Sequence, residues 1–517
     1  MPNAMRPTEF DPLALTVMAH GVAMIAEEMG TILERGALSP NIRERRDASA
    51  ALFDADGRMI AQAAHIPVHL GAMPESVRAV RERNPAPGDV FLLNDPYRGG
   101  SHLPDLTMVE AIADGGAVVG YAAVRAHHAD VGGMSPGSMP RGATELVQEG
   151  IIVPPVRLAT AAGLQDDVLA LVLANVRTPN ERLGDLQAQR AACAAGGVGW
   201  RALRARVGPS ALAAASDALL DYTERRARSR ISELGLVRGA ARDALEGDGV
   251  TDDDIVVCVT VDTVGDCLRL DFSGTSPMAR GNVNCPFAVV RAAAVFVLRT
   301  LLDDDVPTND GIARALDLRV PEGSVINARW PAAVAAGNVE MSQRITDTLF
   351  AALADAGIDV PAQGQGTMNN VTFGGAGWTF YETLGGGQGA TSRGDAPSAV
   401  HVGMSNTRNT PIESLEDAYP IRIDAYEVRR GSGGIGKHRG GNGVVRAYRV
   451  LEPCTATLLT ERRRHAPRGA AGGGPGTPGR NLLNGKPLPA KCRVELVPGD
   501  VLTIETPGGG GWGATPR

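Results

Sequence analysis

Five of the nine histidines in this chain fall between residues 65 and 128, and two of the segments there could do chemistry. The first runs from Asn94 to Asp105 and places His102 three residues before Asp105. The second is Ala126-His127-His128-Ala129-Asp130, some twenty residues later. Neutral imidazole and carboxylate groups together bind divalent cations well. The crowding of these residue types therefore predicts a metal centre.

A metal centre that activates water needs about three or four protein ligands and one open position. His102 and Asp105 come from one loop stiffened by proline and glycine, which lowers the entropic cost of presenting both ligands together. His127 or His128 could complete the set from the neighbouring strand end. Adjacent strand residues point to opposite faces, so one of the two can be a ligand while the other serves elsewhere. Asp47, at the end of Arg43-Glu44-Arg45-Arg46-Asp47, is a candidate fourth ligand.

Structural roles are the alternative for the same residues. Asp105 could be a turn residue, and buried histidines are often satisfied by hydrogen bonds alone. For His65 and His69, in His65-Ile66-Pro67-Val68-His69, a structural role and a place in a substrate pocket are about equally supported.

Three other motifs resemble known sites but lack a part. The run 431–438 nearly fits a phosphate loop, but His438 stands where a hydroxyl should meet magnesium, and the glycines after it cannot start a helix. A glycine-rich loop between strands is the preferred interpretation. The run 385–390 is a weak dinucleotide fingerprint because no helix clearly follows it. Ser101 precedes His102 in sequence, which does not place its hydroxyl on that imidazole, so no catalytic serine is assigned.

Composition favours a soluble, multidomain protein. The chain has 517 residues, 44% of them hydrophobic and 21% charged, with a net charge of −7. This charge argues against a nucleic-acid surface. Six scattered cysteines without a C-x-x-C pair fit a reducing cytosol. No secretory segment is recognised at the N-terminus, and the apolar run Leu13 to Ile25 is short of the ~20 residues that a membrane span needs. We therefore expect a cytoplasmic protein without a membrane partner.

Hydrophobic periodicity and turn residues place the candidate ligands at strand ends. Val90 to Leu93 is a short strand that delivers the Asn94 loop, and the second of two paired strands ends at the histidine pair. From residue 165 to 246 the sequence is predicted to be mostly helical, with breaks at 178–179, 196–197 and 208–209. Further helices are predicted at 11–36, 73–83, 288–302 and 342–356. Further strands are predicted within 49–61 and at 107–111, 117–125, 255–261, 268–272, 443–450, 456–460, 493–497 and 501–505, and the tail 506–513 is predicted to lack regular structure.

The expected fold class is mixed α+β. The predicted organisation is an N-terminal α/β metal-bearing region (1–164), a helical segment (165–250), a central α/β region (251–427) and a glycine-rich, β-containing C-terminal region (428–517).

With these residues in view, the chain resembles the B-type polypeptide of the hydantoinase/oxoprolinase family, which includes ATP-dependent lactamases and subunits of acetone and acetophenone carboxylases. The resemblance covers nearly the whole chain. The matching segments are 39–47, 65–71, 94–105, 125–133, 175–179, 271–276, 337–340, 342–344, 366–370 and 406–411. Departures are small: Ala48 stands where relatives often have an aromatic residue, and Ser101 where threonine is common.

The resemblance implies a divalent metal, zinc, manganese or iron, held by Asp47, His102, Asp105 and His127. It selects His127 over His128, which the spacing does not. It also implies a partner A-type subunit that binds ATP and phosphorylates the carbonyl oxygen of the substrate, in a hetero-oligomer of (αβ)2 type. The carboxylase subunits of the family tend to be longer, so the length of this chain favours ring opening.

The resulting prediction is an ATP-dependent hydrolase subunit that opens a cyclic amide such as a hydantoin, 5-oxoproline or a lactam. Metal-activated water would attack the activated carbonyl carbon. His128 or Asp130 would accept a proton or orient a ligand. The alternatives are a subunit of an ATP-dependent ketone carboxylase and a non-catalytic partner that stabilises the ATP-binding subunit.

Overall fold

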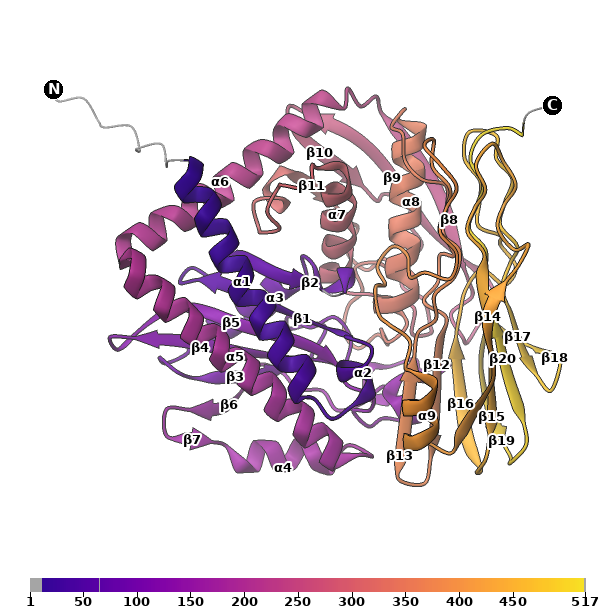
Figure 1. Cartoon of the computed structure of the whole chain (residues 1–517), viewed down its shortest axis with the longest axis horizontal. Coiled ribbons are helices and arrows are strands. Elements are labelled where there is room, and N and C mark those ends of the chain that lie inside the picture. The colour runs from indigo at the N-terminus through magenta and orange to yellow at the C-terminus, as the bar shows by residue number, and fades with distance from the viewer. Residues whose placement is uncertain (1–11, 65, 516–517) are drawn as a thin grey trace.

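The computed structural model describes residues 12–64 and 66–515 and has the mixed α+β architecture expected from the sequence (Figure 1). The α-helices among these residues are α1 (Pro12–Gly36), α2 (Pro40–Arg43), α3 (Met73–Arg81), α4 (Asp166–Ala174), α5 (Pro179–Val207), α6 (Pro209–Glu233), α7 (Phe287–Leu301), α8 (Ser342–Asp355) and α9 (Ile412–Ala418). Shorter turns are the 3-10 helices η1 (Pro67–His69), η2 (Pro136–Ser138), η3 (Leu146–Gln148) and η4 (Ala313–Ala315) and the π-helix η5 (Gly337–Met341).

A seven-stranded antiparallel sheet forms the N-terminal half, in the order β2-β1-β5-β4-β3-β6-β7. Its strands are β1 (Ala48–Asp54), β2 (Met59–Ala64), β3 (Val90–Leu93), β4 (Asp105–Asp114), β5 (Ala117–His127), β6 (Val156–Thr160) and β7 (Gly163–Leu164). The strands predicted at 49–61, 90–93, 107–111 and 117–125 are confirmed.

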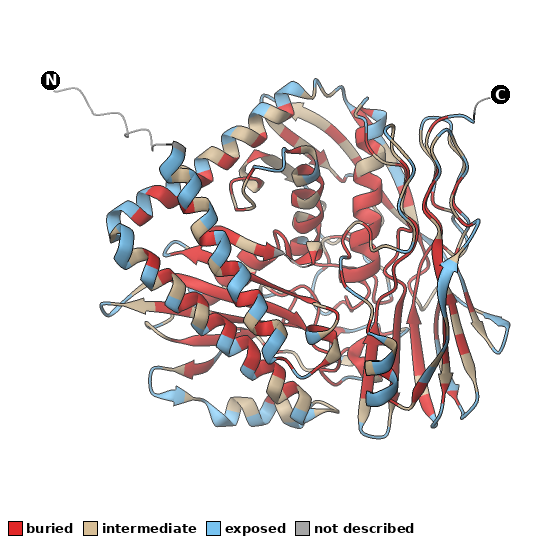
Figure 2. Ribbon diagram, viewed as in Figure 1, coloured by how far each residue is buried: buried red, intermediate tan, exposed pale blue. Residues whose placement is uncertain are grey.

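Both faces of this sheet are buried. Successive residues of a strand point to opposite faces, so Ala50 and Leu52 of β1 join one core cluster while Ala51 and Phe53 join another. Helices α1 and α5 cover the first face, with buried inner sides and exposed outer sides (Figure 2). If such a strand slipped by one residue, the side chains of one core would point into the other. The register, and with it the position of the strand ends, is therefore strongly specified.

Helix α1 confirms the predicted N-terminal helix, although Asp11, its expected N-cap, lies outside the described residues. The helix continues to Gly36, so by length and composition its segment Leu13–Gly36 could cross a membrane, contrary to the length argument from the sequence. One face nevertheless packs in the core, as in a helix of a globular domain. The buried residues are Met18, Val22, Ala26, Met29 and Leu33.

The helical segment predicted after residue 165 is confirmed for α4, α5 and α6 but is wrong at two points. Residues 239–246 form strand β8 (Gly239–Glu246), paired with β9. Gly196 and Gly197 do not break α5, because they allow close packing: a Cβ at Gly196 would collide with Met29 of α1 and Ala122 of β5. Glycine inside a helix costs about 1 kcal/mol relative to alanine, which tight helix packing can offset.

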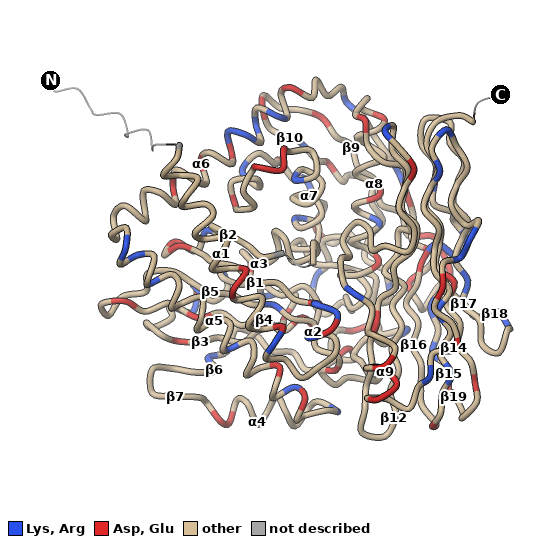
Figure 3. Tube along the Cα trace, viewed as in Figure 1, with Lys and Arg blue, Asp and Glu red and all other residues tan. Residues whose placement is uncertain are grey.

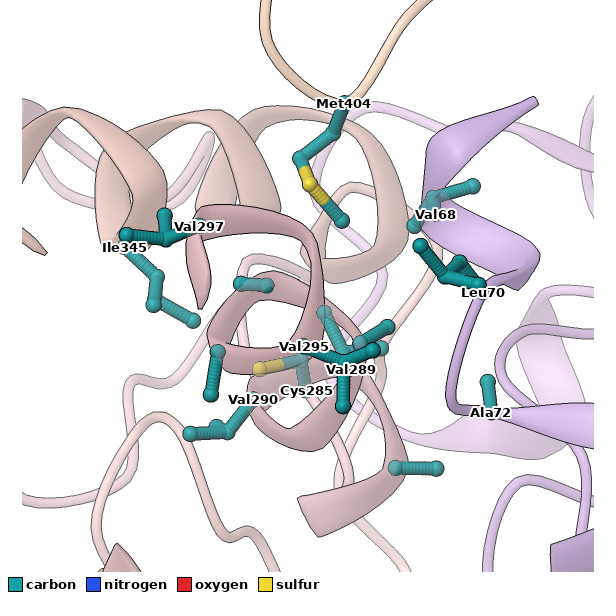
Figure 4. Packing of buried hydrophobic residues seen from close by; sticks show 14 of the residues in the cluster. Val68, Leu70, Ala72, Cys285, Val289, Val290, Val295, Val297, Ile345 and Met404 are labelled. Carbon is teal, nitrogen blue, oxygen red and sulfur yellow. The ribbon is translucent and has the colours of Figure 1, made fainter. Parts of the chain in front are cut away.

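A second sheet, in the order β11-β10-β9-β8, packs against α7 and α8. Its other strands are β9 (Asp254–Val264), β10 (Cys267–Asp271) and β11 (Leu316–Arg319). Helix α8 is buried along nearly its whole length (Figure 2). Figure 4 shows residues of this core, where Val68 and Leu70 from the η1 region and Met404 approach α7. This packing anchors the loops at 66–72 and 402–407, which both reach the candidate site.

The C-terminal part holds two further sheets, in the orders β13-β12-β16-β19 and β14-β15-β20-β17-β18, around a third core cluster. Acidic and basic residues are interspersed over this part, as elsewhere in the chain (Figure 3). The predicted strands at 443–450, 456–460, 493–497 and 501–505 are confirmed. The strands are β12 (Asn370–Gly375), β13 (Trp378–Glu382), β14 (Ile421–Arg429), β15 (Gly443–Val450), β16 (Cys454–Leu459), β17 (Arg480–Leu483), β18 (Lys486–Leu488), β19 (Lys491–Leu496) and β20 (Val501–Glu505).

Glycine-rich segments from four parts of the chain lie side by side beyond these sheets. They are extended and carry no strand assignment, as predicted for the tail, but backbone hydrogen bonds join them. Gly441 N donates to Gln388 O and Gly509 N to Gly441 O, each at 2.9 Å, and Gly434 N donates to Gly509 O at 2.8 Å. The phosphate-loop-like run 431–438 is one of these segments and connects β14 to β15, in agreement with its interpretation as a glycine-rich loop.

Candidate metal centre

Three neighbouring strands of the first sheet, β1, β5 and β4, bring three candidate ligands together at one end. These are Asp47, just before β1, Asp105, the first residue of β4, and His127, the last residue of β5. In the β4–β5 pairing, Asp105 lies directly opposite His127. In the β1–β5 pairing, Ala48 lies opposite Ala126, and His127 N donates to Asp47 O at 3.0 Å. Residues that share a register position across an antiparallel pair have adjacent side chains. The candidate ligands gather here although they are far apart in sequence.

The loop before β4 delivers His102. Asn94 fixes this loop: its Nδ2 donates to Leu103 O at 2.8 Å, and its Oδ1 accepts from Val153 N at 2.7 Å. A Cβ at Gly100 would collide with the carbonyl of Asn94, so the tight bend requires glycine. The side chain of His102 is fully buried.

Nitrogen and oxygen atoms of three residues converge. His102 Nε2 lies 3.0 Å from Asp105 Oδ1 and 3.2 Å from His127 Nδ1. His127 Nδ1 lies 3.1 Å from the same Asp105 oxygen. Each residue thus offers one possible ligand atom to a single point. All three side chains are buried, so any charge among them is shielded little by water.

The hydrogen bonds of His102 indicate that this cluster suits a cation. Its Nδ1 lies 3.0 Å from the carbonyl oxygen of Ala335, which can only accept, so Nδ1 carries the proton. In the neutral imidazole, Nε2 then presents a lone pair to a carboxylate oxygen, an arrangement that needs a proton or a metal ion between the two atoms. A histidine whose second nitrogen donates to a carbonyl is a common metal ligand. His127 Nε2 is also buried and has no hydrogen-bond partner among the described residues.

The other oxygen of Asp105 is held by hydrogen-bond donors. Ser101 Oγ donates to Oδ2 at 2.8 Å and Asn338 Nδ2 at 3.0 Å, and His69 Nε2 lies 3.4 Å away. Burial alone would raise the pKa of Asp105, but the charge and hydrogen bond of His102, with hydrogen bonds from the other two imidazoles, hold this pKa well below its usual range. Asp105 is therefore an anion at neutral pH, as a metal ligand must be.

The pKa values of His102 and His127 shift in opposite directions. Burial would lower the pKa of His102, but the charge of Asp105 raises it above the ordinary value. Burial lowers the pKa of His127, despite its hydrogen bond to Asp105. His127 thus keeps a lone pair at neutral pH.

Asp47 lines the same small cavity without joining the three converging atoms. Its carboxylate lies 4.0 Å from the buried guanidinium of Arg45. The cavity of about 20 Å³ has room for about one water molecule. Its walls include Tyr381, whose ring stacks on that of His127 at 4.5 Å between centroids. The other lining residues are Ile66, Val68, His69, Asp105, Asn338, Val339, Met368, Thr383, Ser405 and Thr407.

Glu149, in the turn after η3, supports His102 through the backbone. Its two carboxylate oxygens accept from Val334 N at 3.1 Å and from Ala335 N at 2.8 Å. These bonds position the carbonyl of Ala335 that sets the tautomer of His102. Burial raises the pKa of Glu149 to about 8, against the two backbone hydrogen bonds and the charge of His102, which lower it.

We expect the stability of the chain to fall as the pH rises from about 4.5 to about 8, in part because of Glu149. As the pH rises, the Glu149 carboxyl ionises near 4.5 in the unfolded chain but only near 8 in the folded one. Between these pH values the unfolded state is therefore stabilised relative to the folded state. The variant Glu149→Gln keeps the shape without the ionisation. The difference in unfolding free energy between wild type and variant, measured in urea with a chelator present, should change by a few kcal/mol between pH 5 and pH 8. A difference that is constant across this range would contradict the assignment.

The structure does not bring His128 and Asp130 to the cluster. His128 directly follows β5, and its side chain contacts α5 instead: Nε2 lies 3.0 Å from Gln189 Oε1. Burial and the charge of Arg182 lower its pKa to about 4. Asp130 accepts from Gly132 N and Gly137 N, both at 3.0 Å, and pairs with Arg177 at 2.9 Å. The roles predicted for His128 and Asp130, accepting a proton or orienting a ligand, stay predictions.

Sequence reasoning missed several parts of the site. It left His69 undecided, and the structure places this residue against Asp105, whereas His65 lies outside the described residues. It assigned no role to Glu149, Asn338 or Tyr381. Asn338 lies in the matching segment 337–340, which was a usable signal, and in a π-helix, a feature frequent at functional sites.

The chain is similar to known proteins in both sequence and fold. The family model described as "Hydantoinase B/oxoprolinase" matches residues 11–515. The chain is 37% identical to 5-oxoprolinase 1 of Arabidopsis thaliana, over 98% of this chain and 42% of that protein. It is 30% identical to a putative D-/L-hydantoinase polypeptide, of the B type, from Pseudomonas sp. strain NS671, over 98% and 90% of the two chains. The chain thus spans about two fifths of the length of the plant oxoprolinase.

Two solved structures share the fold. The ATP-dependent caprolactamase of Pseudomonas jessenii superposes with a TM-score of 0.90 at 26% identity, over 98% of this chain and 91% of that one. A nucleotide-free acetone carboxylase superposes with a TM-score of 0.85 at 18% identity, over 98% and 76%. At that lower identity the second likeness concerns the fold alone.

Proposed function

The chain belongs to the Hydantoinase B/oxoprolinase family, and we propose that it is the B-type subunit of an ATP-dependent enzyme that opens cyclic amides. The observation that carries the proposal is the convergence of His102, Asp105 and His127 in a buried cavity. The oxoprolinase and caprolactamase relatives support amide hydrolysis as the reaction class.

Four residues would hold the divalent ion, zinc, manganese or iron: Asp47, His102, Asp105 and His127. When bound, such an ion lowers the pKa of water and so supplies a nucleophile at neutral pH. The chain itself orients the ligands. Ser101 and Asn338 fix the carboxylate of Asp105, and the Ala335 carbonyl fixes the tautomer of His102. His128 and Asp130 would position the strand end and the loop that follows it.

The activation of the amide is assigned to a partner. An unstrained amide is a poor electrophile. A phosphoryl group on its oxygen would make the carbonyl carbon a better electrophile for water, whose addition allows the ring C–N bond to break. The proposed partner is an A-type, ATP-binding subunit, in keeping with the name of the Pseudomonas relative and with the much longer plant oxoprolinase. The proposed assembly is an (αβ)2-type hetero-oligomer in the cytoplasm, with a hydantoin, 5-oxoproline or a lactam as substrate.

Replacing His102 by alanine tests the proposal. In the assembled complex with ATP and cyclic amide, we expect His102→Ala to lose most of the bound metal and to lower ring opening at least about 100-fold, because one convergent nitrogen is removed. Metal content is measured by elemental analysis and ring opening by product formation. His20→Ala changes an exposed histidine of α1 and should leave both unchanged.

Unchanged metal content and ring opening in His102→Ala would remove the proposal. A chain that binds no metal, and whose histidine variants keep full activity in the complex, would instead be a non-catalytic partner. ATP turnover that depends on bicarbonate and a ketone would assign the chain to a carboxylase.

A further inference from the structure

Three hydroxyl groups line the same cavity as Asp105 and His127. They belong to Thr383, which follows β13, and to Ser405 and Thr407 of the loop at 402–407. All three side chains are buried. Buried hydroxyls usually satisfy their hydrogen bonds, so the direction of each bond can be derived from its partners.

Arg45 donates to two of these hydroxyls and so determines where their hydrogens point. Its Nη2 donates to Thr383 Oγ1 at 2.6 Å and to Thr407 Oγ1 at 3.4 Å. The other guanidinium nitrogens donate to Asn41 Oδ1 and to the carbonyls of Tyr381 and Arg408. A guanidinium can only donate. Both threonine oxygens therefore accept from Arg45, and both hydroxyl hydrogens must point away from it.

His401 connects the remaining hydroxyl. Its Nδ1 lies 2.7 Å from Ser405 Oγ and its Nε2 3.3 Å from Thr407 Oγ1, while the two threonine oxygens are 2.8 Å apart. Burial, followed by the charge of Arg45, lowers the pKa of His401 to about 3, so the ring is neutral. One ring nitrogen then donates and the other accepts.

Two sets of donor directions satisfy all three hydrogen bonds among Thr383, Thr407, His401 and Ser405. In the first, Thr383 donates to Thr407, Thr407 to His401 Nε2, and His401 Nδ1 to Ser405, so the hydrogen of Ser405 is left over. In the second, every bond is reversed and the hydrogen of Thr383 is left over. Among the described residues, each arrangement leaves one hydroxyl hydrogen, and in both cases the hydroxyl that carries it lines the cavity.

We propose that Thr383, Thr407, His401 and Ser405 form a hydrogen-bond relay, oriented by Arg45, that binds a negatively charged oxygen of the substrate beside the metal cluster. In both arrangements Arg45 donates to Thr383 and Thr407, and a buried cation that donates to hydroxyls polarises them as donors, which favours an anionic acceptor. The inference rests on the proposed function in naming that acceptor: a non-bridging oxygen of the phosphoryl group on the activated amide. The chemical class that the relay recognises is an oxyanion.

The relay predicts a non-additive kinetic effect. In Ser405→Ala the hydrogen of Thr383 remains available, and in Thr383→Val that of Ser405 remains, so each single variant should lower kcat/KM of the assembled enzyme only about threefold. The double variant loses both and should fall at least about 100-fold, the order expected for losing an oxyanion donor. Thr383→Ser, which keeps the hydroxyl, should restore the value of the single Ser405→Ala variant when combined with it. Metal content should be unchanged throughout.

A binding measurement separates this inference from the proposed function. Inorganic phosphate is titrated into the metal-loaded, full-length chain with ¹⁵N-labelled histidine, and the imidazole signals of His401 are followed by NMR. Phosphate should shift these signals in the wild type and leave them unshifted in the double variant. The shift is expected whether or not ring opening is the reaction. Additive kinetics, or His401 signals insensitive to phosphate in the wild type, would overturn the relay even if ring opening itself is observed.

Discussion

Replacing Asp105 by asparagine is expected to abolish metal binding while leaving the fold intact. Oδ1 of Asp105 faces nitrogen atoms of both His102 and His127, so the charge of one carboxylate serves the entire cluster. A neutral amide removes that charge and can turn its NH₂ group toward the lone pairs of the imidazoles. We expect metal content to fall from about one ion per chain to near zero, and ATP-dependent ring opening to fall by about 1000-fold or more.

The stability of this variant tests the explanation. Because the amide supplies a donor where acceptors converge, Asp105→Asn should unfold in denaturant and chelator at least as late as the metal-free wild type. Asp253→Asn, at an exposed position before β9, is the matched control and should change neither metal content nor activity. A variant that keeps its metal, or that loses it only because it fails to fold, would contradict the assignment of Asp105.

Replacing Gly509 by alanine is expected to disrupt the glycine-rich C-terminal segments. A Cβ at this position would occupy the space of the backbone carbonyl of Gln388. The segments are joined by backbone hydrogen bonds through Gly441 and Gly434, so none can move away alone. We expect a loss of more than about 4 kcal/mol in unfolding free energy, or failure to accumulate as soluble protein. Denaturant unfolding and soluble yield measure this.

Gly394→Ala is the control for that substitution. Neither Gly394 nor Gly509 is among the glycines with a positive φ, but a Cβ at Gly394 would meet nothing within 4 Å. Its replacement should change stability by less than about 1 kcal/mol. If both substitutions were equally mild, the close approach of the segments would not be a requirement of the fold.

Elements with local signals were predicted well from the sequence. Short apolar runs bounded by turn residues located β3, β4 and β5, and the proline and glycine residues of the 94–105 segment marked a rigid loop. Errors arose where distant contacts override a local preference. The Gly196-Gly197 pair was predicted to break the helix because the sequence does not show that Met29 packs against Gly196. Strand β8 was predicted to be helical because its partner β9 lies beyond a loop.

The sequence by itself determined which residue types could bind a cation, since the crowded histidines and aspartates, with the family resemblance, selected Asp47, His102, Asp105 and His127. Only the tertiary structure decided how they meet. Strand register places Asp105 opposite His127, and segments more than 200 residues away supply Asn338 and the carbonyl of Ala335. The relay from Arg45 to Ser405 likewise joins residues over 300 positions apart. A hydrogen bond requires its two atoms to lie about 3 Å apart. Side chains so far apart in the sequence come that close only when the sheets and cores pack.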